Sequence, residues 1–488
     1  MKIAQIFFPV SAVSLLALSC VSKSDTATVK IQVKNLDGRE VIYNRSYDGV
    51  YLATDTPVTL DADSTFTLSL PTGGGIEYVR IIARDPNRNH PYVHKAFYAL
   101  PGTTEVTIDP SAEENVAIVP PTGNSLDGQA AQSAFDIYNM WWSLATSQAD
   151  PLDLGNDSVP AMAIGKLNEY TDSMIGVYSD ASPAVRKALE RDANLMKLMV
   201  FNQCVYLNHK KENAMEWKRE LTQLREQTDM TNPANALNPF FGSDITSSLC
   251  AGDILHDYNY PEGVTPDSML RAKTEYYLNT YNGKTAESAI GTLLYNDAVR
   301  NTYSPSAPAI TEHFKELFPS SGLIPLLDEK AAENKAFNNP EESDEIVFID
   351  NSQIKTLAEV LAPYKGKPVL IDVWATWCGP CRASFAHVEP IQKYAEENGI
   401  QLLYLSIDEQ PDIENQWKRM ARYYKLKGHH LLINPDIRQE VFSTFGENGY
   451  LSIPRHAIVD REGNLTLCPQ QLSESNDFAP LRALLDSL

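Results

Sequence analysis

The fold of the C-terminal part is decided by the stretch Val369-Leu370-Ile371-Asp372-Val373-Trp374-Ala375-Thr376-Trp377-Cys378-Gly379-Pro380-Cys381-Arg382. Apart from Asp372, its first six residues form an apolar run, which predicts a central strand buried on both faces. Cys378 and Cys381 follow, and a helix is predicted to begin there and to run to about Glu397. Cysteines one helical turn apart bring their sulfurs close enough to close a small disulfide ring.

Strands and helices alternate along the rest of this part of the chain. We predict a second apolar strand at Gln401–Ile407 and a helix at about Ile413–Tyr424. A strand at Ile453–Asp460 and another at Leu465–Leu467 then flank the turn Arg461–Asn464. Two strand–helix units followed by a strand pair, with the cysteines at the first strand–helix junction, predict an α/β domain.

The segment from Trp374 to Cys381 resembles the thioredoxin active-site motif. The order of elements is similar to that of the TlpA-like exported thiol–disulfide oxidoreductases, and the resemblance covers about residues 340 to 488. It implies a thioredoxin fold for residues 346–488. By position, Asp372 matches the family's buried carboxylate, and Pro454 matches the cis-proline that faces the disulfide.

The chemistry of these residues agrees with the resemblance. Cys378 is expected at a helix N-terminus, where free amides and the helix dipole favour the thiolate. Cys381 lies one turn further in and should stay protonated. Asp372 lies in an apolar strand, where burial favours the neutral carboxyl, so it is suited to take the proton of Cys381. Cys378 would then attack a substrate disulfide, and Cys381 would release the reduced substrate.

Substrate contacts are expected from the residues around the two cysteines. Trp377, Gly379 and Pro380 flank the cysteines directly. Pro454 has no amide hydrogen and, if it is cis, exposes backbone groups of Ile453 for pairing with an extended substrate segment. The Gly379-Pro380 dipeptide resembles the reducing members of the family, so the predicted reaction is reduction or exchange of protein disulfides.

Several alternatives stay open at this level. A zinc site is disfavoured, because no second pair of closely spaced cysteines accompanies the first, and we predict no metal and no organic cofactor. A thiol peroxidase of the same fold would carry a hydroxyl residue three places before Cys378, where this chain has Ala375. A third alternative is a surface binding protein in which the redox domain is accessory.

The N-terminus predicts export. Residues 1–19 have a positive start at Lys2 and an apolar run to Leu18, which is typical of a signal peptide. Cys20 follows directly and resembles the lipidated cysteine of a bacterial lipobox, although Ala17 stands where that motif prefers leucine. Residues 20–26 would then be a tether. The prediction is a lipoprotein on the periplasmic side of the envelope, favouring the outer membrane, with disulfide-containing exported proteins and a membrane thiol reductant as partners.

Composition limits the remaining functions. The chain has 488 residues, too many for one hydrophobic core, and about three domains are expected at roughly 150 residues each. Its formal net charge of -22 argues against nucleic-acid binding, because phosphate backbones would be repelled. Six cysteines are too few for a disulfide-built scaffold. Cys204, Cys250 and Cys468 are expected as small buried residues, although a Cys204–Cys250 bridge stays open.

In the part of the chain before the α/β domain, the spacing of apolar residues changes once, from a strand pattern to a helical pattern. Residues 27–112 alternate with period two in short segments, which predicts a β-sandwich-like domain. Residues 125–332 have helical periodicity, for example behind the helix start Ser182-Pro183, and predict an all-α region. The polar, acidic segment 333–345 is predicted as a linker. The expected protein is therefore multidomain, with a β-sandwich, a helical region and a thioredoxin fold.

Overall fold

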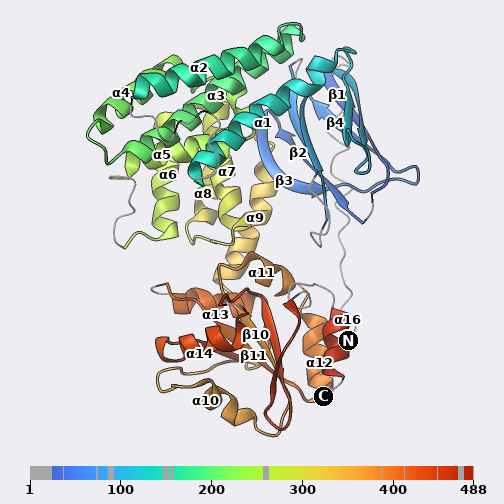
Figure 1. The fold of residues 1–488 in the computed structure, drawn as a ribbon, viewed down its shortest axis with the longest axis vertical. Coiled ribbons are helices and arrows are strands. Elements are labelled where there is room, and N and C mark those ends of the chain that lie inside the picture. Colours follow the sequence, from blue (N-terminus) through green and yellow to red (C-terminus); the bar gives the residue numbers. More distant parts are fainter. Residues whose placement is uncertain are drawn as a thin grey trace. The chain divides into compact units, whose positions relative to one another are not determined.

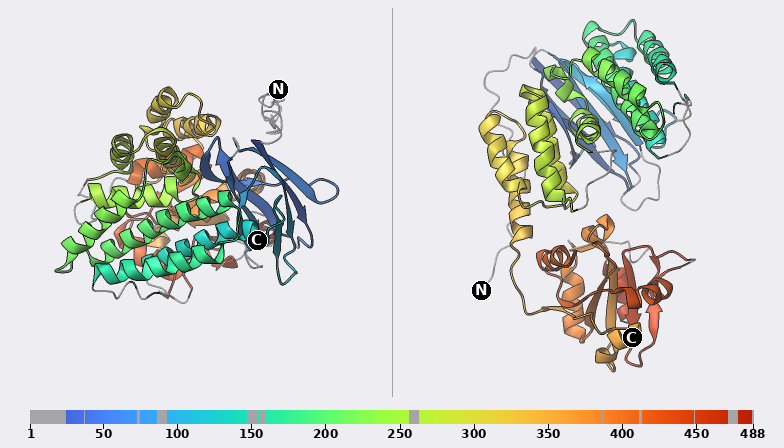
Figure 2. Two further views of the ribbon diagram at one scale, coloured as in Figure 1. Left: turned by 90° about the horizontal axis from the view of Figure 1, so that it is seen from above. Right: turned by 90° about the vertical axis from the view of Figure 1, so that its left-hand side faces the viewer.

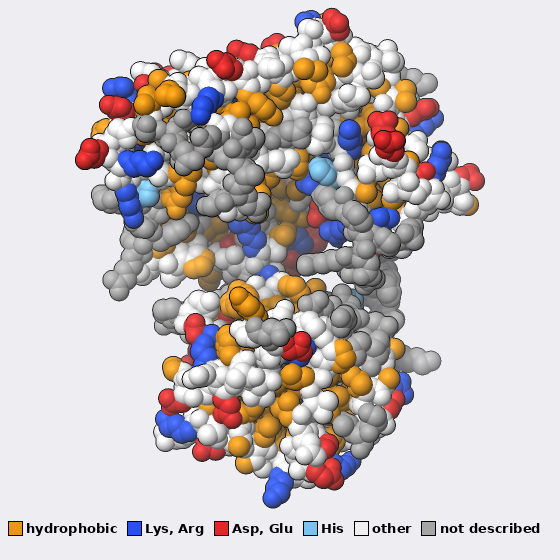
Figure 3. All heavy atoms as spheres, in the orientation of Figure 1, with side chains coloured by type: hydrophobic (Ala, Val, Ile, Leu, Met, Phe, Trp, Pro, Cys, Tyr) orange, Lys and Arg blue, Asp and Glu red, His pale blue; other side chains and the backbone are white. Residues whose placement is uncertain are grey.

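The computed structural model describes residues 25–36, 38–72, 75–85, 93–146, 152, 154, 159–255, 263–385, 387–410, 413–447, 449–470 and 478–486. Cys20 and the predicted signal peptide lie outside these residues. The chain divides into two compact units, Met1–Ala331 and Ala332–Leu488, which are described separately. None of the described helices is long and apolar enough to cross a membrane. On the face drawn in Figure 3, acidic, basic and hydrophobic side chains are interspersed.

Two four-stranded sheets form the first part of the N-terminal unit. One has the order β4-β1-β7-β8, with β1 (Thr26–Val33), β4 (Thr65–Pro71), β7 (Gly102–Ile108) and β8 (Val116–Val119). The other has the order β3-β2-β5-β6, with β2 (Glu40–Tyr47), β3 (Val50–Pro57), β5 (Glu77–Arg84) and β6 (Val93–Ala99). Alternate residues of both sheets, among them Val29, Ile31, Val79, Ile81 and Phe97, share one buried core. The two sheets therefore pack face to face as a sandwich.

Helices make up the rest of this unit (Figure 2). They are α1 (Ser125–Ala145), α2 (Pro160–Val177), α3 (Pro183–Asn208), α4 (Ala214–Gln227), α5 (Thr246–Ile254), α6 (Pro266–Thr280), α7 (Gly283–Val299), α8 (Ala307–Leu317) and the first part of α9 (Ile324–Asn338), whose residues from Ala332 on belong to the C-terminal unit. Helix α3 begins at Pro183 after Ser182, as the sequence predicts. A second buried cluster joins Tyr78 and Tyr98 of the sheet to alanines of α1 and to Val185 and Leu189 of α3. The helices thus cover the outer face of the β3-β2-β5-β6 sheet.

Glu77, at the start of β5, gives this unit a pH-dependent stability. Its side chain is 6% exposed, and Oε2 has no hydrogen-bond partner among the described residues. Burial, with a smaller contribution from Asp48, raises the pKa of Glu77 from 4.5 to about 8. Because the folded pKa lies above the unfolded one, the stabilisation from protonated Glu77 is complete below the unfolded pKa and is lost as pH rises through the folded pKa.

We therefore predict that Glu77→Gln stabilises the N-terminal unit at alkaline pH. The free energy of unfolding, measured with urea, should rise by on the order of 1–3 kcal/mol near pH 9 and change far less near pH 5. The exposed Glu105 of β7 supplies the control, because Glu105→Gln should change neither value. Equal effects of Glu77→Gln at both pH values would contradict the prediction.

The segment predicted as a linker, 333–345, is partly helical. Helix α9 continues through it to Asn338. Asn334 and Phe337 are both buried, and the ring of Phe337 lies 5.6 Å from that of Tyr423 within the C-terminal unit. The acidic composition suggested a solvated chain, but two buried side chains at helical spacing favour the helix.

Figure 1 shows the C-terminal unit in orange and red. It contains a six-stranded sheet with the order β14-β13-β10-β11-β12-β9. The strands are β9 (Ile346–Phe348), β10 (Val369–Trp374), β11 (Gln401–Ser406), β12 (Gly428–Leu432), β13 (Arg455–Val459) and β14 (Leu465–Leu467). The helices are α10 (Leu357–Leu361), α11 (Gly379–Phe385), α12 (Glu389–Asn398), α13 (Ile413–Tyr423), α14 (Pro435–Phe445) and α16 (Phe478–Leu485). All six residues of β10 are buried, as predicted, and β10 pairs in parallel with β11 and antiparallel with β13.

Two features of this unit differ from the sequence expectations. The helix predicted from the cysteines to Glu397 is divided into α11 and α12. Pro390 stands in the first turn of α12, where its missing N–H is tolerated, but it could not continue an existing helix. The adjacent His429 and His430, which the sequence alone favours as a solvated loop pair, lie in the strand β12, and His430 is fully buried. Burial lowers the pKa of His430 to about 4.

Candidate active site

Cys378 and Cys381 form a disulfide at the junction of β10 and α11. The S–S distance is 2.00 Å and the two Cα atoms are 5.3 Å apart. Cys378 is 3% exposed and Cys381 is fully buried. The backbone N–H of Cys381 points to Cys378 Sγ at 3.1 Å. A donor in this place favours a negative charge on Cys378 when the disulfide is reduced, so Cys378 is the more suitable nucleophile.

Asp372 lies on the sheet face that α11 covers. Asp372 and Trp374 are two residues apart in β10 and therefore point to the same face. The Trp374 ring lies 5.1 Å from that of Phe385, which belongs to α11. Cys381 is four residues before Phe385 and shares its side of the helix. The structure therefore brings the predicted carboxylate and the predicted resolving cysteine to the same side of β10.

One oxygen of the Asp372 carboxylate lies near an imidazole. Oδ2 lies 3.4 Å from Nε2 of His456, which is the cross-strand partner of Asp372 in β13. Oδ1 is buried and has no hydrogen-bond partner among the described residues. Both side chains are nearly inaccessible, with 11% of Asp372 and 7% of His456 exposed. From the sequence, His456 is expected only as a strand residue beside Pro454, and nothing there connects it with Asp372.

Asp408 is a functional candidate that the sequence reasoning missed. It follows β11 and is 3% exposed. Its carboxylate accepts hydrogen bonds from the backbone N–H of Thr376 at 2.9 Å and from the Thr376 hydroxyl at 2.8 Å. The Ser406 hydroxyl donates a third bond at 2.6 Å. Asp408 therefore fixes the turn that leads into Cys378. The carboxyl ends of parallel strands meet at one sheet edge, and this rule could have pointed to Asp408.

We predict that Asp408→Asn loosens this turn. An amide offers one acceptor oxygen and two N–H donors, so at least one present donor would face another donor. The C-terminal unit should lose about 1–3 kcal/mol of stability, and brief iodoacetamide treatment of the reduced protein should label Cys378 several times more slowly. Glu409 is the next residue and is exposed, so Glu409→Gln serves as the control variant. Unchanged labelling in Asp408→Asn would mean that the turn is fixed without this carboxylate.

The predicted substrate contacts lie in two segments, one directly around Cys378 and one just before β13. Trp377, Gly379 and Pro380 are exposed, and 57% of the Trp377 side chain is accessible. The peptide bond between Ile453 and Pro454 is cis. The next residue, Arg455, is buried and donates to the carbonyl oxygens of Phe445 at 3.2 Å and Cys468 at 2.9 Å. These hydrogen bonds of Arg455 fix the end of the loop that carries Pro454.

The other cysteines do not join this site. Cys204, Cys250 and Cys468 are buried and not disulfide-bonded, and the open Cys204–Cys250 bridge is not formed. Burial raises the pKa of both Cys250 and Cys468 to about 11, which makes them poor nucleophiles at neutral pH. Within the described ranges, no group of three His, Cys, Asp or Glu side chains is arranged to hold a metal ion.

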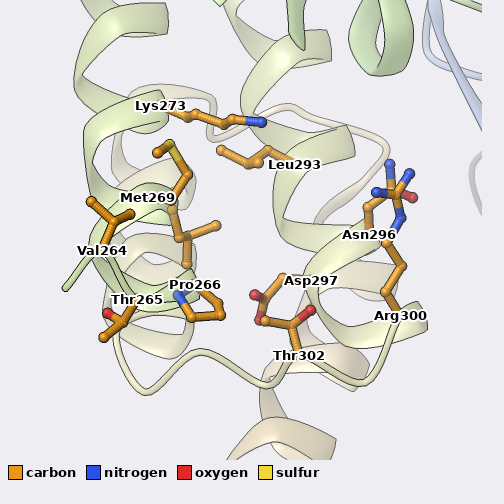
Figure 4. Close-up of a pocket in the computed structure, with 11 residues that line it drawn as sticks. Val264, Thr265, Pro266, Met269, Lys273, Leu293, Asn296, Asp297, Arg300 and Thr302 are labelled. Atoms are coloured by element: carbon orange, nitrogen blue, oxygen red, sulfur yellow. The ribbon is translucent and has the colours of Figure 1, made fainter. Parts of the chain in front are cut away.

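A pocket of about 330 Å³ lies in the helical part of the N-terminal unit. Figure 4 shows Met269 and Lys273 of α6 facing Leu293 and Asp297 of α7. The ammonium of Lys273 donates to the Ser247 hydroxyl at 2.9 Å, and burial lowers the pKa of Lys273. The Asp297 carboxylate accepts hydrogen bonds from the N–H and hydroxyl of Ser304. The pocket contains no thiol and belongs to a different kind of site from the cysteine pair.

Comparison with known proteins places the cysteine pair in a family. The family model described as Redoxin matches residues 329–479. These residues form a Redoxin domain. The thiol–disulfide oxidoreductase ResA of Bacillus thuringiensis subsp. konkukian (strain 97-27) is 28% identical over 105 residues, or 22% of this chain and 56% of the relative. A thioredoxin of Acidithiobacillus ferridurans is 36% identical over 76 residues, which cover 15% of this chain and 65% of that protein.

The chain thus spans little more than half the length of the first of these relatives. Among solved structures, a putative thiol–disulfide oxidoreductase from Bacteroides vulgatus is 30% identical, with a TM-score of 0.18. The match covers 22% of this chain and 65% of that one. The relatives of the Redoxin domain are thiol–disulfide oxidoreductases and thioredoxins, which confirms the resemblance predicted for the C-terminal domain.

Proposed function

We propose that this chain is an exported, lipid-anchored thiol–disulfide oxidoreductase that reduces or exchanges protein disulfides. The observation that carries the proposal is the Cys378–Cys381 disulfide at the start of α11 in the Redoxin domain. Its substrates are disulfide-containing exported proteins, and a membrane thiol reductant returns the pair to the dithiol. The chemistry needs no organic cofactor, because the two cysteine thiols supply the two electrons that reduce the substrate disulfide.

The reaction runs through two exchanges. In the reduced protein the Cys378 thiolate attacks one sulfur of the substrate disulfide, and a mixed disulfide forms while the other substrate sulfur leaves as a thiolate. Cys381 then loses its proton to Asp372 and attacks Cys378 Sγ. The mixed disulfide breaks, the second substrate sulfur leaves, and the Cys378–Cys381 bond forms. The substrate is reduced and the cysteine pair is oxidised.

Turnover of insulin with dithiothreitol as reductant tests this function. The wild-type chain should reduce insulin at a rate that Cys378→Ser abolishes, while Cys468→Ser, which removes a buried free thiol of the same unit, leaves it unchanged. A chain that consumes hydrogen peroxide with dithiothreitol but leaves insulin oxidised would instead be a thiol peroxidase. Ala375 counts against that alternative, because it offers no hydroxyl for a peroxide.

Export and anchoring are part of the same proposal. The apolar run ending at Cys20 and the polar segment after it support lipidation at that cysteine. When the chain is expressed with its N-terminus in a Gram-negative host, it should partition with outer membranes. Cys20→Ala should release it or block its maturation. Soluble wild-type protein with an N-terminus other than Cys20 would contradict the anchor and leave the redox function standing.

The pocket between α6 and α7 favours a second function, the capture of a small anion with an apolar body. Lys273 supplies a positive charge that no carboxylate pairs with among the described residues, and Met269, Leu270 and Leu293 supply apolar walls. This corresponds to the surface binding protein predicted as an alternative. The test is a fluorescence titration with 8-anilinonaphthalene-1-sulfonate. Lys273→Met should weaken binding about tenfold, and equal binding would rule out the pocket as the site.

A further inference from the structure

One row of side chains crosses the sheet of the Redoxin domain behind the cysteines. Strand register places His456 of β13 opposite Asp372 of β10, Asp372 opposite Tyr404 of β11, and Tyr404 opposite His430 of β12. Directly opposed residues point to the same face of a sheet. The Tyr404 and His430 rings are stacked, with centroids 4.6 Å apart. Asp372 is therefore enclosed by an imidazole on one side and a phenol on the other.

The two oxygens of Asp372 have different surroundings. Oδ2 faces His456 Nε2 at 3.4 Å, whereas Oδ1 is buried without a hydrogen-bond partner among the described residues. A buried polar atom without a partner costs free energy and is uncommon in folded proteins. Hydrogen bonds at reacting sites are often long at rest and shorten during the reaction. An oxygen left open on the sheet face that α11 covers fits a proton acceptor for Cys381 that is oriented through its other oxygen.

We propose that His456 is a positioning residue for the resolving step. Its Nε2–H holds Asp372 Oδ2, so that Oδ1 is directed to take the proton of Cys381. This inference rests on the proposed thiol–disulfide function and adds to it the residue that orients the base. His456 does not touch the substrate or either sulfur in this assignment.

The proton balance of the step is simple. The Cys381 Sγ–H bond breaks and its proton goes to Asp372 Oδ1. The Cys381 thiolate forms a bond with Cys378 Sγ, and the bond from Cys378 to the substrate sulfur breaks. The departing thiolate is protonated by solvent, and Asp372 later returns its proton to solvent. The titratable groups that face Asp372 within the sheet are His456 from β13 and Tyr404 from β11. Cys381 belongs to α11, which covers the same face of the sheet.

Ellman's reagent, 5,5′-dithiobis(2-nitrobenzoate), separates the two steps in the pre-reduced, full-length chain. Attack by Cys378 releases one thionitrobenzoate, and resolution by Cys381 releases a second, so stopped-flow absorbance should show two phases. The first phase reports the proposed function and the second reports this inference. The Cys378→Ser variant supplies the background from the other thiols. Loss of both phases in the wild-type chain would defeat the proposed function itself.

For His456→Leu we expect an unchanged first phase and a second phase slowed about tenfold near pH 7. His456→Gln keeps an N–H donor and should restore the second phase to within about threefold, which a purely structural role would not require. In an Asp372→Asn background, His456→Leu should not slow the second phase any further. His429→Leu, in β12, controls for the loss of a strand histidine. A normal second phase in His456→Leu, or equal slowing of both phases, overturns the inference. If His456→Leu does not fold, the rates of His456→Gln in the wild-type and Asp372→Asn backgrounds decide it.

Discussion

A Cys381→Ser variant should hold its substrate on Cys378 as a stable mixed disulfide instead of releasing it. Cys378 keeps its position at the start of α11 and the backbone N–H of residue 381 that points to its sulfur, so attack should proceed. Serine cannot displace a disulfide, because an alcohol at neutral pH is a far weaker nucleophile than a thiol. Turnover of insulin should therefore fall by roughly three orders of magnitude or more, while one substrate equivalent stays attached.

The trapped mixed disulfide is detected by non-reducing electrophoresis and mass spectrometry after the variant is incubated with periplasmic extract or oxidised insulin. Cys378→Ser/Cys381→Ser is the matched control and should capture nothing. The captured proteins also name the clients, which the sequence does not. If the adduct forms on Cys381 in the Cys378→Ser variant and not on Cys378 in the Cys381→Ser variant, the two cysteine roles are reversed.

Local sequence was sufficient for the part of the site that lies on consecutive residues. The apolar run of β10 and the cysteines directly after it predict both the strand and the disulfide pair, because strand burial and cysteine spacing are short-range patterns. Pro454 was found through the family resemblance and is cis in the structure. The prediction of a single helix after the cysteines is wrong, because Pro390 stands in the first turn of a second helix, α12.

The supporting residues could not be found in the same way. Asp408 reaches Thr376 across 32 residues of sequence, and His456 meets Asp372 only because β13 and β10 pair in a particular register. Register depends on the whole sheet, which includes strands β9 and β12 that the sequence analysis did not predict. His430 was expected in a solvated loop, yet β12 buries it beside Tyr404. Long-range pairing, rather than local propensity, decides these positions.

Asp372→Asn should slow resolution and leave attack unchanged. The substitution preserves the size of the side chain in the buried strand, and an amide oxygen does not accept a proton at neutral pH. Cys381 would then have to lose its proton to solvent, from which it is fully buried. The second phase of the reaction with Ellman's reagent should slow about a hundredfold near pH 7. The first phase should keep its rate, because the Cys381 N–H and the Thr376–Asp408 contacts beside Cys378 remain.

The pH profile distinguishes loss of a base from loss of structure. A free thiol ionises near pH 8.5, so the deficit of Asp372→Asn should shrink as the pH rises toward about 9, where hydroxide replaces the carboxylate. A variant that merely packs badly would be slow at every pH. Removal of a buried carboxylate should leave the thermal midpoint equal or higher, because the desolvation penalty of the charge is gone. If the second phase is as fast as in the wild type across this range, Cys381 loses its proton by another route and Asp372 is only a packed residue of β10.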